Sequence, residues 1–224
     1  MRPARETMPA AEQQFIVVEG PIGVGKTSLA RLLAASLAGQ PVLEDASQNP
    51  FLERFYRSPR TGALPAQLYF LFQRCQQLAA LNQQDLFAPV RVADYLWEKD
   101  RLFARVTLDD AEFALYEQVS GRLDVQAPKP DLVVYLQAPV DVLLERIARR
   151  AIGYEQYIDR EYMVRLNEAY ARFFHEYESA PLLIVNAAAI DPVNNPADYE
   201  ELFGAIRRMR RGRLYYNPMG ARAI

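Results

Sequence analysis

Residues 20–27, GPIGVGKT, have the residue types and spacing of a phosphate-binding loop, G-x-x-x-x-G-K-[ST]. The glycines let backbone N–H groups turn inward and approach phosphate oxygens closely. A helix that begins at the end of the loop directs its positive end at the same charge. We therefore expect Lys26 to reach the β and γ phosphates of a nucleoside triphosphate, and the Thr27 hydroxyl to bind Mg²⁺. The predicted nucleotide-binding residues are Gly20, Gly23, Gly25, Lys26, Thr27 and Ser28.

Two acidic residues follow short apolar segments that we interpret as strands, Glu44 after 41–43 and Asp94 after 90–93. Open α/β sheets bind their ligands at the carboxyl edge of the strands, where both acids would lie. Asp94 could reach the Mg²⁺ beside Thr27, or it could cap a helix or face solvent. Glu44 could accept a proton from an attacking hydroxyl. From spacing alone, an ordinary turn acid explains Glu44 equally well.

Short apolar segments alternate with longer amphipathic segments along most of the chain. This alternation predicts an α/β fold of the P-loop NTPase type, with a five-stranded parallel sheet and helices on both faces, in three layers. The predicted strands are 14–19, 41–43, 90–93, 131–136 and 181–185, and the predicted helices are 26–37, 50–56, 65–81, 109–121, 140–150, 160–177 and 197–209.

The sequence predicts a single domain at residues 14–210, with flexible tails at 1–13 and 211–224. The break at about 150–158 between two predicted helices is expected to form a short arginine-bearing lid. Residues 1–13 are too polar for a signal peptide, and no apolar run approaches the roughly 20 residues that a membrane span needs.

The charge balance gives no sign of a nucleic-acid or membrane-surface partner, since the formal net charge is −2 over 224 residues. The single cysteine, Cys75, excludes an internal disulfide and fits a reducing compartment, so we expect a cytoplasmic protein. Of the 26 basic residues only Lys26, Lys99 and Lys129 are lysine. In so arginine-rich a chain, a lysine in the loop suggests a site that needs a compact, flexible ammonium.

Four segments together resemble the bacterial deoxynucleoside kinases. Residues 44–56, EDASQNPFLERFY, resemble the acidic strand end and NPFL-x-x-FY helix of that family, and residues 67–74, QLYFLFQR, resemble its Q-x-x-x-x-x-x-R helix. Residues 131–136 and 144–150 resemble its fourth strand and the beginning of its lid. The resemblance covers about residues 14–210. It implies transfer of phosphate from ATP, with Mg²⁺, to the 5′-hydroxyl of a deoxynucleoside.

The resemblance implies a catalytic set of four residues. Glu44 would be the general base on the nucleoside 5′-hydroxyl, and Lys26 would hold the donor phosphates. Arg146 and Arg150 would be lid arginines that close on the transferring phosphoryl group. They are four residues apart and share a helix face, and a mobile arginine can stabilise developing negative charge. The alternative for this pair is a solvated basic face, since Arg149 lies beside them.

The resemblance also implies a nucleoside-binding set. Tyr56 and Glu155 would hold the sugar 3′-hydroxyl, Gln67 would bind the base edge, and Arg74 would order that pocket. Gln67 and Arg74 are seven residues apart and therefore share a helix face. An amide offers a donor and an acceptor to a purine or cytosine, so we favour deoxyadenosine, then deoxyguanosine or deoxycytidine. The aromatic residues that could wall the base are Phe70, Tyr69 and Phe72.

One departure from the family pattern follows the third strand. The family has an acidic-Arg-Ser triplet where this chain has Asp94, Tyr95 and Leu96. Either Tyr95 replaces the arginine or the register is shifted by one, and the sequence KDR at 99–101 is compatible with both. Asp100 could pair with Arg74 beneath the base, or it could face solvent.

A second departure lies in the lid. The family often has R-G-R where this chain has Arg150, Ala151 and Ile152, so the second arginine is absent. Arg149 or Arg101 could substitute for it.

Two other functions stay open at this point. A thymidylate-type nucleoside monophosphate kinase shares the loop, sheet and lid, but it needs further cations for the acceptor phosphate, and the segment after the second strand is acidic. A non-catalytic nucleotide-binding relative would explain the missing arginines, but intact Lys26, Thr27 and Glu44 argue against it. The family resemblance implies that two copies of the chain form a homodimer. It also implies a small nucleoside as the substrate that the chain binds.

Overall fold

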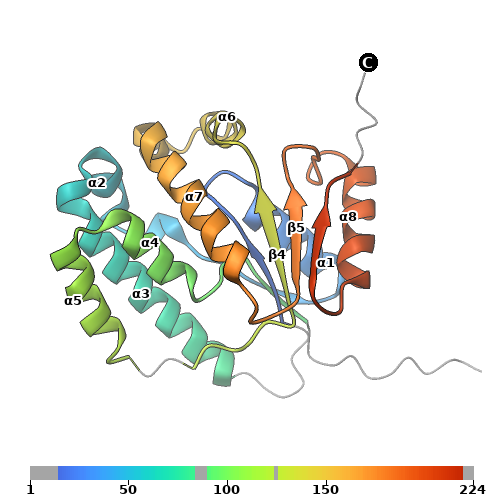
Figure 1. Ribbon diagram of the computed structural model, residues 1–224, viewed down its shortest axis with the longest axis horizontal. Helices are drawn as coiled ribbons and strands as arrows, with labels where there is room; N and C mark the ends of the chain where they lie inside the picture. Colours follow the sequence, from blue (N-terminus) through green and yellow to red (C-terminus); the bar gives the residue numbers. More distant parts are fainter. Residues whose placement is uncertain (1–14, 84–89, 124–125, 219–224) are drawn as a thin grey trace, which may run out of the picture.

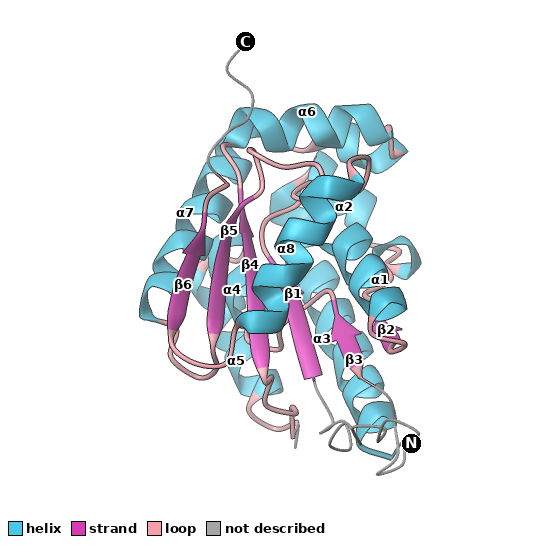
Figure 2. Ribbon diagram, turned by 90° about the vertical axis from the view of Figure 1, so that its right-hand side faces the viewer, coloured by secondary structure: helices cyan, strands magenta, loops and turns pink. Residues whose placement is uncertain are grey.

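The computed structural model of the chain describes residues 15–83, 90–123 and 126–218, so the predicted tail at 1–13 lies outside the described residues. Its strands form one parallel sheet in the order β2-β3-β1-β4-β5-β6 (Figure 2). The described strands are β1 (Phe15–Glu19), β2 (Gln40–Val42), β3 (Arg91–Ala93), β4 (Leu132–Gln137), β5 (Leu182–Asn186) and β6 (Arg213–Tyr216).

Helices cover both faces of this sheet, which confirms the predicted three-layer α/β architecture (Figure 1). One face carries α1 (Lys26–Ser36) and α8 (Pro196–Arg208), and the other carries α3 (Pro59–Gln83), α4 (Lys99–Thr107) and α7 (Arg160–Glu176), with α5 (Asp110–Ser120) outside them. At the carboxyl edge lie α2 (Leu52–Arg57), α6 (Val140–Arg150) and the 3-10 turns η1 (Ala46–Gln48) and η2 (Gly153–Tyr157). None of the helices in the described ranges combines the length and apolar character that crossing a bilayer requires.

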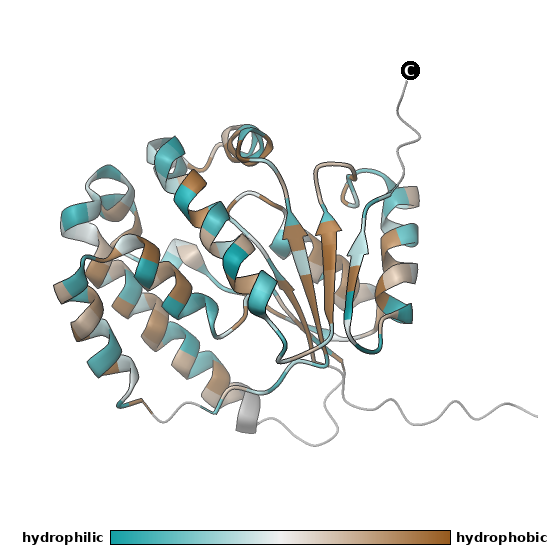
Figure 3. Ribbon diagram, in the orientation of Figure 1, coloured by the Kyte–Doolittle hydropathy of each residue, from teal (hydrophilic) through white to brown (hydrophobic). Residues whose placement is uncertain are grey.

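The central strands β1, β4 and β5 are apolar in all but their last residue because helices cover both of their faces. In β4 every residue but the last is buried, and the same holds for β5. Figure 3 shows most of both strands in brown, the colour of hydrophobic residues. Tyr135 of β4 stacks on Phe174 of α7, with ring centroids 4.0 Å apart. These contacts make a rigid platform whose carboxyl edge carries the loops.

The order of connection places a crevice at the end of β1. From β1 the chain runs to β2 and β3 on one side, and it then crosses to β4 and β5 on the other. Loops that leave β1 and β3 therefore diverge at this point, which is where open α/β sheets bind ligands.

The predicted strand count was wrong, because the sheet has six strands rather than five. The sixth, β6, pairs in parallel with β5 and lies within residues 211–224, which were predicted to be a tail. As an edge strand, β6 has three exposed residues out of four, so it lacks the continuous apolar run that marked the others.

One helix is longer than predicted, and another was not predicted. The helix predicted at 65–81 begins at Pro59, where proline suits a first turn, and Pro65 lies inside it. Helix α4 was not predicted, although it begins at Lys99 and determines where the KDR segment at 99–101 points. By contrast, α6 has the predicted bounds, and Asp109 caps α5 in a capping box with Glu112.

A substitution at the end of α6 should stabilise the chain. Ala151 caps this helix with a φ of 52°, a left-handed conformation that costs a non-glycine residue about 1 kcal/mol. Ala151→Gly should therefore raise the free energy of unfolding in urea by up to about 1 kcal/mol. The matched control Ala148→Gly, at an exposed position inside α6, should lower it by about 1 kcal/mol. A lower free energy of unfolding for Ala151→Gly would contradict the conclusion that Ala151 is strained in its left-handed conformation.

Candidate active site

The loop after β1 is fixed in shape by two glycines. Gly20 has a φ of 148°, and a Cβ there would lie 2.4 Å from the carbonyl oxygen of Leu136 in β4. Gly23 has a φ of 83°, and a Cβ there would lie 2.8 Å from the carbonyl oxygen of Leu143 in α6. Only glycine allows the loop to approach both elements this closely while its N–H groups line the head of α1.

Two cations contact the backbone of this loop. Lys26 Nζ donates to the carbonyl oxygens of Gly20 (2.7 Å) and Pro21 (3.0 Å). Burial and the nearby Lys99 ammonium lower the pKa of Lys26 to about 8. Arg146 of α6 donates to the Val24 carbonyl oxygen (3.2 Å), and to the Ala187 carbonyl oxygen after β5 (2.7 Å). The predicted catalytic residues Lys26 and Arg146 therefore both lie at the loop.

Asp94 connects the loop to the next strand. Its buried carboxylate accepts from the Thr27 hydroxyl (2.5 Å) through Oδ2, and from the Glu44 backbone N–H (2.8 Å) through Oδ1. Mg²⁺ bound to nucleotides takes one or two protein oxygens and completes its shell with phosphate and water. A threonine hydroxyl and a carboxylate at the head of α1 fit that requirement, so Thr27 and Asp94 are the residues that would hold the ion.

Glu19 is a further buried carboxylate, which the sequence analysis missed. It accepts from the backbone N–H groups of Gly20 (2.8 Å) and Leu96 (2.7 Å) and from the Tyr170 hydroxyl (3.0 Å). These bonds tie the loop after β1 to the loop after β3 and to α7. The signal in the sequence was an acid that ends an apolar strand directly before the glycines.

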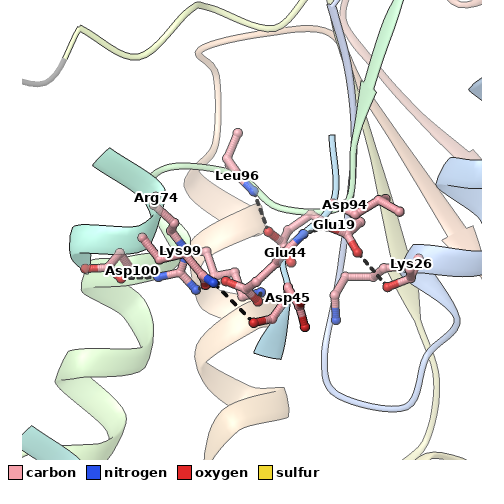
Figure 4. Close-up of polar contacts among 12 residues, drawn as sticks. Glu19, Lys26, Glu44, Asp45, Arg74, Asp94, Leu96, Lys99 and Asp100 are labelled. Atoms are coloured by element: carbon pink, nitrogen blue, oxygen red, sulfur yellow. Dashed lines mark hydrogen bonds and ion pairs between the residues drawn. The ribbon is translucent and has the colours of Figure 1, made fainter. Parts of the chain in front are cut away.

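Glu44 lies between two buried cations (Figure 4). Its carboxylate accepts from Arg74 of α3, and from Lys99 Nζ of α4 at 2.8 Å. Burial alone would raise the pKa of Glu44, but the charges of Arg74 and Lys99 outweigh burial and lower it to about 2. Glu44 is therefore ionised at neutral pH. Lys99 was not among the predicted site residues.

Arg74 also pairs with Asp100, which confirms that predicted contact. The Arg74 and Asp100 side chains are each 2% exposed, and the Tyr116 hydroxyl of α5 donates to the second oxygen of Asp100. The Arg74 guanidinium also lies over the Phe70 ring, 5.2 Å from its centroid. One side of the cleft thus ends in a closed network of charged side chains.

A cleft beside this network joins the loop to α2, α3 and η2. The predicted residues Tyr56, Gln67, Phe70 and Glu155 all line it, together with Lys26. Gln67 is buried, and its Oε1 has no hydrogen-bond partner among the described residues. The unpredicted aromatic residues that line the cleft are Phe55, Phe103, Tyr154 and Tyr162.

The lid segment is joined to the cleft by an ion pair. Arg150 at the end of α6 binds both oxygens of the buried Glu155 in η2. Tyr154 stacks on Tyr56, with ring centroids 6.2 Å apart and an interplanar angle of 14°. Ile152 is 37% exposed. The predicted lid arginine and the predicted sugar-binding acid are thus partners.

Several predicted alternatives are contradicted by the geometry. Arg101 pairs with Glu117, and Arg149 pairs with Glu145, each on the outer surface with a side chain 69% exposed, so neither substitutes for a missing arginine. Tyr95 is buried below the Arg74 guanidinium and does not line the cleft. Arg101 and Arg149 lie on outward faces of α4 and α6, whereas Tyr95 lies in the loop between β3 and α4, beneath Arg74.

Two predicted aromatic walls are also absent from the cleft. Phe72 is 47% exposed on α3, and Tyr69 packs edge-on against Phe51. Both lie on the faces of α3 that turn away from Gln67 and Phe70.

Comparisons with known proteins identify the family of the chain. The family model described as deoxynucleoside kinase matches residues 16–209. The chain is 30% identical to a deoxyguanosine kinase of Bacillus subtilis over 201 residues, which cover 87% of this chain and 97% of that one. It is also 30% identical to a deoxyadenosine kinase of Lactobacillus acidophilus over 207 residues, covering 86% and 94% of the two chains.

Solved structures show the same fold. A deoxyadenosine kinase from M. mycoides, solved with the products dCMP and a flexible dCDP, superposes with a TM-score of 0.76 at 23% sequence identity. The match covers 88% of this chain and 100% of that one.

Removing Arg74 should test the buried network. In Arg74→Met the buried Asp100 loses its cation, so the free energy of unfolding in urea should fall by about 3–5 kcal/mol. The matched control Arg101→Met removes an exposed ion pair and should cost less than about 1 kcal/mol. Equal, small effects of the two substitutions would show that the buried network does not contribute this much to the free energy of unfolding.

Proposed function

This chain belongs to the deoxynucleoside kinase family and is a kinase, and on that premise we propose that it transfers phosphate from ATP to the 5′-hydroxyl of deoxyadenosine. Deoxyguanosine and deoxycytidine are the next candidates. One observation carries the proposal: the Glu44 carboxylate lies in the same cleft as Lys26 of the phosphate loop and Gln67 of α3. The groups that we assign to the donor and to the acceptor thus line one cleft together with an ionised carboxylate.

In the proposed step Glu44 receives the proton of the 5′-hydroxyl. The 5′-oxygen forms a bond to the γ-phosphorus while the bond from that phosphorus to the bridging oxygen breaks, and the electron pair leaves on the β-phosphate of ADP. Lys26 and the loop N–H groups hold the donor phosphates. Mg²⁺ held by Thr27 and Asp94 would neutralise phosphate charge.

The low pKa of Glu44 constrains its role as a base. A carboxylate with a pKa of about 2 is a weak proton acceptor. In a loose phosphoryl-transfer transition state little charge develops on the attacking oxygen, so strong deprotonation is not required. We infer that Glu44 acts chiefly by orienting the hydroxyl and takes the proton late.

The cleft also supports the choice of acceptor. A buried amide oxygen without a partner favours a ligand that brings a donor, and the exocyclic amine of adenine supplies one to Gln67 Oε1. We propose that Tyr56 and Glu155 bind the sugar 3′-hydroxyl, as the family resemblance implies.

The lid and the assembly complete the proposal. We propose that residues 150–158 act as the lid of a single kinase domain and that Arg150 and Arg146 face the transferring phosphoryl group. From family membership alone, we propose that two copies of the chain pair as a homodimer.

A substrate screen tests the reaction. With ATP and Mg²⁺, deoxyadenosine should give the fastest nucleoside-dependent formation of ADP among the four deoxynucleosides, and thymidine the slowest. The variant Lys26→Met should abolish all turnover, which excludes a contaminating kinase. Folded protein with no turnover on any deoxynucleoside would refute the proposal. Phosphorylation of dTMP in preference to thymidine would identify a monophosphate kinase instead.

Substitution of Glu44 tests the acceptor carboxylate. Glu44→Gln should lower kcat by at least about 100-fold, because the amide neither accepts the proton nor orients the hydroxyl. ATP binding, measured by calorimetry, should stay within about threefold of wild type, since the phosphate loop is unchanged. The control Glu53→Gln, on the exposed face of α2, should keep full activity. A kcat for Glu44→Gln within threefold of wild type would exclude this role.

A further inference from the structure

Lys99 occupies a position that is unfavourable for a lysine. It is the first residue of α4, where a cation opposes the helix dipole, and it is 6% exposed. Its Nζ donates to Glu44 Oε2 at 2.8 Å and lies 5.4 Å from the centroid of the Phe103 ring. Residues that break local preferences in this way are often retained for function.

The pairing of the other cations singles out Lys99. Arg74 is shared with Asp100, and Arg150 binds Glu155 through both oxygens. Lys26 contacts the carbonyl oxygens of the phosphate loop. Among the described residues that line the cleft, Lys99 is the cation that forms an ion pair with Glu44 and with no other carboxylate.

Lys99 is also close to the donor side of the cleft. After burial, the Lys99 ammonium is the next cause that lowers the pKa of Lys26. Both line the cleft together with Glu44, Thr27 and Asp94. A flexible ammonium at this place can face a carboxylate and a phosphate in turn, whereas a planar guanidinium fixed by Asp100 cannot.

We propose that Lys99 is a positioning residue for phosphoryl transfer, which holds the Glu44 carboxylate toward the acceptor hydroxyl and supplies the positive charge that the family pattern places at Tyr95. This inference rests on the proposed function. It assigns to the start of α4 the role that Tyr95, Arg101 and Arg149 do not fill, since none of these three lines the cleft.

The charge balance of the reaction explains why a second cation is useful beside Glu44. Before transfer, Glu44 is an anion that faces both Arg74 and Lys99. When Glu44 receives the 5′-hydroxyl proton it becomes neutral, and the acceptor gains a negatively charged phosphoryl group. Lys99 then stands beside the new phosphate ester and compensates its charge, while Arg74 keeps its pair with Asp100. The positive charge is in place before the reaction and needs no reorganisation.

The test compares neutral and charged replacements of Lys99. Lys99→Gln can still donate a hydrogen bond to Glu44 but has no charge, so kcat should fall by about 100-fold, while KM for ATP and for deoxyadenosine changes by less than about threefold. Lys99→Arg keeps the charge and should restore kcat to within about tenfold of wild type. The matched control is Lys129→Gln, because Lys129 is the one lysine outside the cleft and is exposed; its kcat should equal that of wild type.

The outcomes separate this inference from the proposed function. Absence of wild-type turnover on all deoxynucleosides refutes the function itself, whereas a wild-type kcat in folded Lys99→Gln refutes only the role of Lys99. A rise in KM for ATP with kcat unchanged would also overturn it, because it would make Lys99 a simple donor-binding residue. If thermal melting shows Lys99→Gln to be unfolded, Lys99→Arg decides alone: kcat within about tenfold of wild type supports the role, and any larger loss overturns it.

Discussion

The Glu44 carboxylate is held between two buried cations, and the layout of the cleft follows from that constraint. A buried ionised carboxylate is stable only when it is paired, and each cation that pairs it must be satisfied in turn. Arg74 therefore requires Asp100, and Asp100 requires the Tyr116 hydroxyl. Through these four side chains, Glu44 is connected to α5 on the outer surface of the molecule.

Backbone N–H groups fix the other half of the cleft. Asp94 and Glu19 each accept from the main chain of a neighbouring loop rather than from a cation. The loops that leave β1, β2 and β3 are therefore held at fixed distances from each other by carboxylates at the ends of rigid strands. Since Asp94 contacts both Thr27 and the Glu44 backbone, the proposed donor and acceptor sites share one support.

How well the sequence predicted this structure depended on whether the signal was local. The start of α1 at Lys26 and the bounds of α6 were predicted correctly, because each is specified by neighbouring residues. The shared helix face of Gln67 and Arg74 was predicted for the same reason. Strand β6 was missed because its residues are mostly exposed and only its pairing with β5 defines it. Lys99 was missed because its partner is 55 positions away and because α4, which directs it inward, was not foreseen.

The scarcity of lysine has a practical consequence. Two of the three lysines, Lys26 and Lys99, lie in the cleft, and the third, Lys129, is exposed in the segment before β4, at the opposite edge of the sheet. Lys129 is thus the one freely accessible lysine side chain. Among lysine side chains, conjugation of a fluorophore or a surface linker should concentrate there, and molecules attached through Lys129 would share one orientation, with the cleft turned toward solvent.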